Sequence, residues 1–410
     1  MKNILTIILL FTISNTFAKT IVVGKNKPIS SLRQGIKAAI AGDTVLLNKG
    51  IYKEGNIIID KAIYLIGIDE PVLDGEGKYE ILTITGKNIL IKGIHFVNPG
   101  YSSMNDYAAI KIIDATNIII ENNIVSNASF AIHIANSTHS FIRNNTITGT
   151  NKSEHLSGNG IHLWKCSNMV IENNSIRQHR DGIYLEFVTN STIKKNWSEK
   201  NIRYGLHFMF SSDNSYFNNT FRNNGAGVAV MYSKKVTMAG NHFEQNWGSS
   251  AYGILLKDIT DSYIQQNTFI KNTVGIHMEG SSRIEIQKNI FKENGWAIKV
   301  QASCDDNTFH HNNFTGNSFD VGANGSVSLN IFYNNFWDKY EGYDINKDGI
   351  GDIAYHPVSM YSMIVEQNPH TLMLMRSFIV TLLDKAEKAI PSLTPENLTD
   401  NKPMMKSLKL

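Results

Sequence analysis

The sequence predicts an all-β fold, a right-handed parallel β-helix, and two internal repeats carry this prediction. A short phrase of Asn, any residue and then usually Ile or Phe returns about every 22 residues. Its Asn residues are Asn122, Asn145, Asn174, Asn196, Asn219, Asn241, Asn267, Asn289, Asn312 and Asn334. A Gly followed by two apolar residues around one free position also recurs, and this alternation is typical of a strand. These Gly residues are Gly160, Gly182, Gly205, Gly227, Gly253 and Gly275.

A leucine-rich horseshoe also repeats near this length with a regular Asn, but each of its units needs a helical segment. The units of this chain contain few helix formers, which favours the β-helix. Equivalent side chains of stacked coils lie about 4.8 Å apart. We therefore expect the Asn column to form an amide ladder and a Phe column to stack in the core. That Phe column is Phe221, Phe243, Phe269, Phe291, Phe314 and Phe336.

The length of the repeat unit varies only in the connection that precedes its Gly-led strand. The count from each Gly to the following Asn is constant, whereas three connections before the Gly-led strand are lengthened: Asn98 to Tyr107, Thr148 to Gly158 and Asn246 to Tyr252. These insertions should share one corner of the solenoid. Loops that grow from one edge often mark a working face, although tolerated surface insertions would give the same pattern.

The two ends of the chain differ from its middle. Met1 to Ala18 has the features of a secretory signal peptide, and its apolar run is too short to span a membrane. Ser31 to Ala41 has the pattern of a short helix that could cap the first coil. We expect the β-helix with its cap over residues 19–340, an acidic loop over 341–352, and a helical extension and tail over 353–410.

Composition excludes some classes of function. The net charge is +3, without a basic stripe or a nucleic-acid motif, which argues against DNA or RNA as a partner. Cys166 and Cys304 lie about six coils apart, beyond disulfide reach, so we expect unpaired thiols. Either Cys could instead serve a soft metal.

Two columns of side chains should point outward from the Gly-led strand, because they flank its inward apolar pair. The first column is Lys111, His133, His162, Tyr184, His207, Ala229, Leu255, His277 and Lys299. The second column is Ala135, Trp164, Glu186, Met209, Met231, Lys257, Glu279 and Gln301. Met209 and Met231 are then neighbours, with His207 on the same strand as Met209, and such a set suits Cu(I). Alternatively, the two Met side chains form an exposed apolar pair or a docking patch.

A second group of Met and His residues lies in the C-terminal extension. Its members are His356, Met360, Met363, His370, Met373 and Met375, which we predict as further copper ligands. Leu372, Met375, Ile379, Leu382, Ala386 and Ala389 repeat as one face of a helix that Pro391 ends. The alternative is packing, because such an amphipathic helix could dock on the solenoid, a partner or a membrane surface.

An acidic segment between the coils and this helix resembles a calcium loop. Its oxygen-bearing side chains are Asp344, Asn346, Asp348 and Asp352. Their alternation, with Gly at the sixth position, matches the first half of an EF-hand loop. Tyr355 stands where the closing Glu would be, so Asp352 would have to close the site. The sequence predicts either a structural Ca²⁺ site or a hydrogen-bonded acidic turn.

No catalytic motif appears in the sequence. The acid candidates Asp181, Glu186, Asp258 and Asp261 form no obvious pair of carboxylates on adjacent coils with a basic partner. Asp181 precedes a repeat Gly, which marks it as a turn residue. A nucleophile elbow, a P-loop and a zincin motif are all missing from the sequence.

Three segments give the chain a resemblance to a known family. They are Asn334 to Asp344 (NNFWDKYEGYD), Leu382 to Pro395 (LLDKAEKAIPSLTP) and Asp400 to Met405 (DNKPMM). With the acidic loop between them, this order resembles NosD, the family of periplasmic maturation proteins of nitrous oxide reductase. The resemblance covers nearly the whole chain. The coil motifs alone are shared by many polysaccharide-active β-helices and are far less specific.

This resemblance implies a periplasmic protein without enzymatic activity, associated with the inner membrane through its partner. The implied partners are an ABC-type permease with its cytoplasmic ATPase, a lipoprotein copper chaperone as donor, and nitrous oxide reductase. Cu(I) would pass transiently to Met and His ligands, and ATP-driven movement through the C-terminal helix would change access to them. The family pattern does not transfer ligand positions. Two other classes remain open: a polysaccharide-binding or polysaccharide-modifying protein, and a purely structural or adhesive solenoid.

Overall fold

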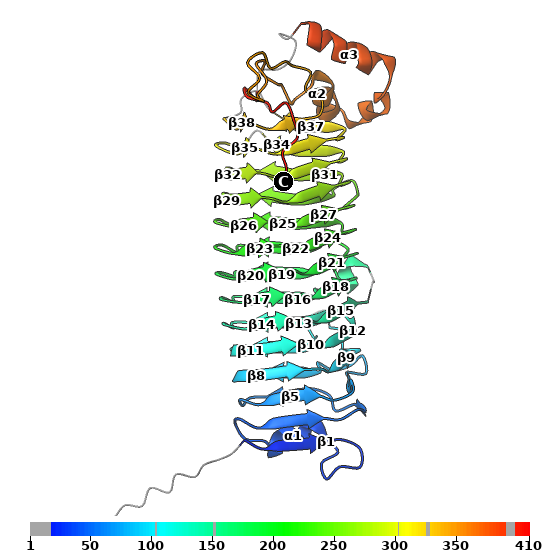
Figure 1. Cartoon of the computed structure of the whole chain (residues 1–410). Coiled ribbons are helices and arrows are strands. Elements are labelled where there is room, and N and C mark those ends of the chain that lie inside the picture. The colour runs from blue at the N-terminus through cyan, green and yellow to red at the C-terminus, as the bar shows by residue number, and fades with distance from the viewer. Residues whose placement is uncertain (1–17, 103–104, 151–152, 302, 325–328, 391–397) are drawn as a thin grey trace, which may run out of the picture.

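The computed structural model describes residues 18–102, 105–150, 153–301, 303–324, 329–390 and 398–410, so most of the proposed signal peptide lies outside the described residues. The chain winds into a long parallel β-helix (Figure 1). Helix α1 (Leu32–Ala38) lies at its first coil, and helices α2 (Met360–Gln367) and α3 (Phe378–Ala389) lie at its far end. The two repeats therefore predict the fold class correctly.

Three long sheets, which we name A, B and C in the order the chain visits them, form the walls. Sheet A contains β1 Thr20–Val23, β2 Thr44–Leu47, β5 Tyr64–Gly67, β8 Lys87–Lys92, β11 Thr116–Glu121, β14 Phe141–Arg143, β17 Val170–Glu172, β20 Thr192–Lys194, β23 Ser215–Phe217, β26 Thr237–Ala239, β29 Thr260–Gln265, β32 Ser282–Gln287, β35 Thr308–His310 and β38 Ile331–Tyr333. Sheet B contains β3 Ile51–Tyr52, β6 Val72–Asp74, β9 His95–Val97, β12 Ile124–Ala128, β15 Thr146–Gly149, β18 Ser175–Arg177, β21 Trp197–Glu199, β24 Thr220–Arg222, β27 His242–Glu244, β30 Thr268–Ile270, β33 Ile290–Lys292, β36 Asn313–Thr315 and β39 Phe336–Trp337. Sheet C contains β4 Ile57–Ile59, β7 Leu82–Ile84, β10 Ala108–Ile113, β13 Phe130–Ala135, β16 Ile161–Trp164, β19 Ile183–Glu186, β22 Tyr204–Met209, β25 Ala226–Met231, β28 Tyr252–Lys257, β31 Val274–Glu279, β34 Trp296–Gln301 and β37 Phe319–Asn324.

The interior contains the predicted stack of aromatic rings, with one correction. Its rings are Phe221, Phe243, Phe269, Phe291, Phe314 and Trp337. Trp337, rather than Phe336, continues the stack, because Phe314 pairs with Trp337 and Phe336 pairs with Asn313. Ser198 holds the position one coil before Phe221, and its hydroxyl donates to the carbonyl of Gly205 at 2.8 Å. A buried hydrogen bond thus replaces a ring where the repeat breaks.

The predicted amide ladder runs along the corner between sheets A and B. Asn241 donates from its backbone N–H and its side-chain Nδ2 to Oδ1 of Asn267, at 2.9 and 3.0 Å. The same Nδ2 also donates to the carbonyl of Tyr216, so both N–H groups of the buried side-chain amide are hydrogen-bonded. At the two ends the ladder residues are Asn123 and Asn335.

The predicted ladder positions Asn122 and Asn334 are therefore wrong by one residue. Both have a positive φ, 55° and 54°, and occupy the left-handed turn position that precedes each ladder residue. Asn tolerates this conformation better than most residues, so an Asn pair is ambiguous in the sequence.

Both ends of the solenoid are closed. At the first coil, Ser31 caps α1 by accepting a hydrogen bond from the N–H of Gln34, and Leu32 and Ile36 are buried. At the last coil, the tail extends the Asn ladder with a carboxylate, because Oδ2 of Asp400 accepts from Nδ2 of Asn335 and from Nε1 of Trp337, both at 3.0 Å. The Pro-Met tail thus stabilises the open end of the stack.

The C-terminal extension differs from the single helix that the sequence predicts from Leu372 to Ala389. A 3₁₀ helix, η2 (Pro369–Leu374), comes first, and α3 begins only at Phe378, capped by Ser377. Pro391, which was expected to end the helix, lies outside the described residues. Among the helices that the structure describes, none is long and apolar enough to cross a membrane.

Candidate metal centre

The register of sheet C confirms the two outward columns. In the first column, paired residues run Lys111, His133, His162, Tyr184, His207, Ala229, Leu255, His277 and Lys299. In the second column they run Ala135, Trp164, Glu186, Met209, Met231, Lys257 and Glu279. The parallel, in-register winding therefore collects on one face residues that lie far apart in the sequence.

The first column is more buried than an external column should be. His162 and His207 keep only 8% and 3% of their surface exposed. The cause is stacking between coils, because the rings of His133 and His162 lie 4.7 Å apart, and those of Tyr184 and His207 also lie 4.7 Å apart. Tyr204 covers His207 from the side, with its ring at 4.8 Å. His207 therefore lies in the outward column, as predicted, but neighbouring rings cover it.

His207 lies next to a buried carboxylate. Its Nδ1 is 3.4 Å from Oδ2 of Asp181, which is only 1% exposed. Arg180 and Arg203 place their Nε atoms 4.0 and 3.9 Å from the same carboxylate. Asp181 is thus more than the turn residue that the sequence suggests, because it orients the ring of His207. The other ring nitrogen, Nε2, is buried and finds no hydrogen-bond partner among the residues that the structure describes.

Met209 and Met231 lie opposite each other at the ends of β22 and β25. Both side chains are partly exposed, unlike the core residues Phe208 and Val230 between the two columns. The structure thus brings two thioethers to the same face as His207. Their role as copper ligands stays a prediction.

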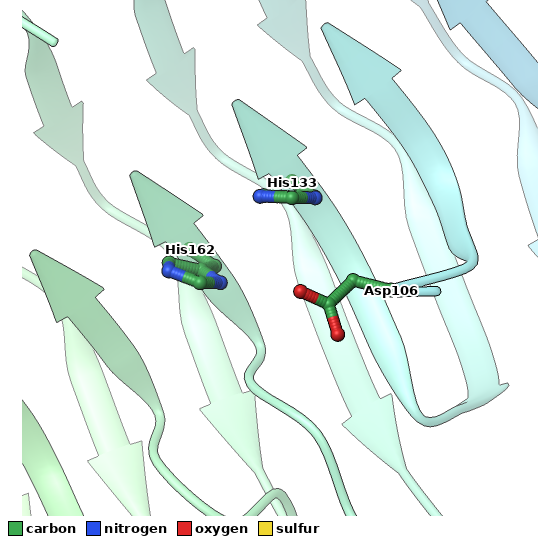
Figure 2. Close-up of side chains that lie close together, drawn as sticks. All are labelled: Asp106, His133 and His162. Atoms are coloured by element: carbon green, nitrogen blue, oxygen red, sulfur yellow. The ribbon is translucent and has the colours of Figure 1, made fainter. Parts of the chain in front are cut away.

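A further group was missed by the sequence analysis. Asp106, His133 and His162 each offer one ligand atom, and these atoms all lie within 4.8 Å of one another. Figure 2 shows the two imidazole rings lying one above the other, with the carboxylate of Asp106 facing their common edge. Among the His, Cys, Asp and Glu side chains that the structure describes, this is the group close enough to share an ion.

The signals for this group were present but separate. His133 and His162 are neighbours in the first outward column, and Asp106 belongs to the first lengthened connection. All three insertions connect sheet B to sheet C, between β9 and β10, β15 and β16, and β27 and β28. The prediction that they share one corner is confirmed. The loop conformation that brings Asp106 to the rings could not be derived from spacing.

The C-terminal Met and His residues differ in how far they are packed against the rest of the protein. Met363 packs against the main core, and Met375 packs against a smaller cluster around Trp296 and Phe319. Met373 is 89% exposed. Copper binding by this group, which also includes His356, Met360 and His370, stays a prediction.

The acidic loop is held by its own side chains. Asp344 accepts from the N–H of Gly349 at 2.8 Å, and Asp352 accepts from the N–H of Ile345 at 2.6 Å. The Nδ2 of Asn346 donates to Asp348 at 3.1 Å. These contacts are those of a hydrogen-bonded turn, the alternative to a calcium site. Calcium binding by this loop stays a prediction.

A hollow of about 430 Å³ on sheet A bears on the polysaccharide alternative. There Asp261 accepts hydrogen bonds from Arg283 on the next coil, at 2.7 and 3.0 Å, which joins a single carboxylate to a basic partner. The hydrogen bonds from Arg283 lower the pKa of Asp261 to about 2. A sugar hydrolase needs a general acid with a raised pKa, which Asp261 is not.

Both cysteines are free and buried, as predicted. Burial raises the pKa of the Cys166 thiol to about 11. A buried thiol of this kind is mostly protonated at neutral pH and is a poor metal ligand.

Solved structures share the architecture. A catalytic domain of a GH87 α-1,3-glucanase gives a TM-score of 0.60 at 12% identity, covering 76% of this chain and 69% of that one. A family 28 exopolygalacturonase from Yersinia enterocolitica gives 0.55 at 10% identity, covering 74% of each chain. At such low identity the similarity establishes the fold alone.

Sequence relatives are more specific. A protein from Stutzerimonas stutzeri named probable ABC transporter binding protein NosD is 30% identical over 197 residues, 43% of this chain and 44% of that protein. A protein of the same name from Pseudomonas aeruginosa is 28% identical over 191 residues, 42% of this chain and 44% of that protein. The matches thus span less than half the length of either relative. The family model described as "Periplasmic copper-binding protein (NosD)" matches residues 143–349, about half of the chain. The chain therefore belongs to the NosD family of periplasmic copper-binding proteins.

Proposed function

We propose that this protein is a periplasmic accessory protein for copper-site assembly of nitrous oxide reductase. It accepts Cu(I) from a lipoprotein chaperone or hands it on, together with an ABC-type permease and ATPase. The observation that carries this proposal is the register pairing of Met209 and Met231 on the face that also presents His207. Thioether and imidazole ligands prefer Cu(I), and family membership supports copper as the ion.

The environment of His207 supports a role as a metal ligand. Its Nε2 has no hydrogen-bond partner in the part of the chain that the structure describes, while Nδ1 faces Asp181 at 3.4 Å. A carboxylate on the far nitrogen of a metal-binding imidazole fixes the tautomer and increases the basicity of the nitrogen that binds. Asp181 is positioned for this supporting role.

Helix α3 is the proposed contact with the membrane partner. Phe378, Ile379 and Leu382 expose 79%, 57% and 55% of their surface, so an apolar face of α3 is uncovered. Helix α2 connects α3 to sheet C, because Glu366 forms an ion pair with Lys299 at 2.6 Å and Met360 N–H donates to Glu387 of α3. Movement of the partner could therefore reach the outward column of sheet C through α2.

A Cu(I) titration tests the proposal. The full-length protein, kept reduced, would be titrated against a Cu(I) chelator, beside the Met209→Leu, Met231→Leu double variant. We expect the variant to lose about tenfold or more in affinity, since Leu keeps the volume but removes the sulfur. Met238→Leu, which alters a fully buried Met of the core, is the matched control.

The same variants would be introduced into cells that lack the parent chain. We expect nitrous oxide reductase from cells with the double variant to contain less copper than enzyme from cells with the parent or the control. Equal Cu(I) affinity and equal copper content of the reductase for parent and double variant would contradict the proposal.

A further inference from the structure

The group of Asp106, His133 and His162 has the burial and geometry of a built site. His162 is 8% exposed, and both of its ring nitrogens are buried without a hydrogen-bond partner among the described residues. Nδ1 of His133 is also buried and has no such partner in that part of the chain. Buried polar nitrogens are nearly always hydrogen-bonded, and leaving one without a partner costs stability. Packing alone therefore gives no reason for two imidazoles at this place.

Neighbouring charges leave the site open to a cation. Lys111, the next residue in the column, is held by Glu80 at 3.1 Å. The carboxylate of Glu186 lies 4.0 Å from Nε2 of His162, too far for a hydrogen bond. Asp106 is exposed and lies in a connecting segment, so its carboxylate is free to approach the rings.

The donor set determines which ion fits. Two imidazole nitrogens and one carboxylate oxygen are ligands for a borderline divalent ion such as Zn²⁺ or Cu²⁺, whereas Cu⁺ prefers sulfur. Ligand atoms around such an ion are about 3.4 Å apart in tetrahedral geometry. The present separations are up to 4.8 Å, so a bound ion would have to draw both rings and the carboxylate of Asp106 closer together.

We propose that Asp106, His133 and His162 form a binding site for a divalent ion of the Zn²⁺ and Cu²⁺ class, with a fourth position open to exchange. This site is distinct from the thioether pair of Met209 and Met231, which suits Cu⁺. The strip of stacked rings from His133 through Tyr184 to His207 connects the two. The inference goes beyond the proposed function and does not rest on it.

Calorimetric titration of the metal-free, full-length protein with Zn²⁺ tests the inference. We expect one ion per chain at this site, and a loss of affinity by about tenfold or more in Asp106→Asn and in His133→Phe. His133→Phe keeps a ring in the stack and removes the nitrogens. Asp114→Asn, which alters an exposed Asp following β10, is the matched control and should bind like the parent.

Co²⁺ provides a second measurement. Its visible absorption should change when it binds through imidazole nitrogen, and Asp106→Asn should weaken this signal even if His133→Phe fails to fold. Unchanged Zn²⁺ affinity in Asp106→Asn together with an unchanged Co²⁺ spectrum would overturn the inference. The Met209→Leu, Met231→Leu variant should keep Zn²⁺ binding. Its loss of Cu⁺ alone would show that the two sites are separate, and equal loss of Zn²⁺ would show that they are not.

Discussion

Two stacks of rings run along this solenoid with nearly the same spacing and opposite consequences. Inside, Phe243, Phe269 and Phe291 stack with ring centroids 4.8 Å apart. On the outer face of sheet C, His133 and His162 stack at 4.7 Å. The inner rings contain no polar atom and stabilise the core. The outer rings bury nitrogens that nothing in the described fold satisfies, so their burial favours a ligand.

The largest effect should follow from breaking the inner stack. Phe269→Ala removes a fully buried ring and leaves a cavity, which costs about 3 to 5 kcal/mol in free energy of unfolding. Denaturant unfolding followed by circular dichroism measures it. Phe187→Ala, at an exposed ring, should cost far less. Similar losses of unfolding free energy in the two variants would show that burial inside the coil does not determine how much a ring stabilises the protein.

The next effect concerns protonation of the outer stack. His162 has a pKa of about 3 when folded and about 6.5 when unfolded. Between these pH values the unfolded chain binds a proton that the folded chain does not. The free energy of unfolding therefore falls as the pH falls through this window, and the full contribution of His162 is present only above it. From pH 7 to pH 5 this single group should cost about 2 kcal/mol.

His162→Phe isolates that contribution. The variant keeps a ring between His133 and Tyr184 but cannot take up a proton. We expect the difference in unfolding free energy between pH 7 and pH 5 to be smaller in the variant by about 2 kcal/mol. Identical pH dependence in parent and variant would show that burial does not perturb His162.

The smallest effect should come from interrupting the outer stack at Tyr184. Its ring lies 4.8 Å from His162 and 4.7 Å from His207. Tyr184→Leu should cost about 1 kcal/mol, since stacking adds modestly to burial. It should also raise the pKa of His162 towards its ordinary value, because a covering ring is lost. Ring-proton NMR across a pH titration measures this shift, and an unmoved His162 titration would rule out shielding by Tyr184.

Much of the fold could be predicted from the sequence because a coil repeat fixes register. The outward columns followed directly, since each strand alternates between inward and outward residues. The predicted ladder positions were wrong by one residue at Asn122 and Asn334, because each of these residues lies beside a second Asn. A second ladder was missed although its signal was available: Asn224, Asn246 and Asn272 follow first-ladder residues by five positions and are linked by the same hydrogen bonds.

The candidate site was less predictable. Column membership gave His133, His162, Met209 and Met231, but the burial of His207 depends on rings from neighbouring coils and on Tyr204. Placement of Asp106 depends on the conformation of an inserted connection, for which periodicity gives no information. Spacing predicts which side chains share a face, and loop geometry decides which of them meet.

The most direct measurement is anomalous diffraction at the copper edge from crystals of the full-length protein, loaded with Cu⁺ under reducing conditions and separately with Cu²⁺. Our account predicts copper on the outer face of sheet C in both cases. The reduced ion should lie within about 2.3 Å of the sulfur atoms of Met209 and Met231, and the oxidised ion within about 2.1 Å of His133 and His162. Copper confined to the C-terminal extension, with none on sheet C in either state, would contradict the account.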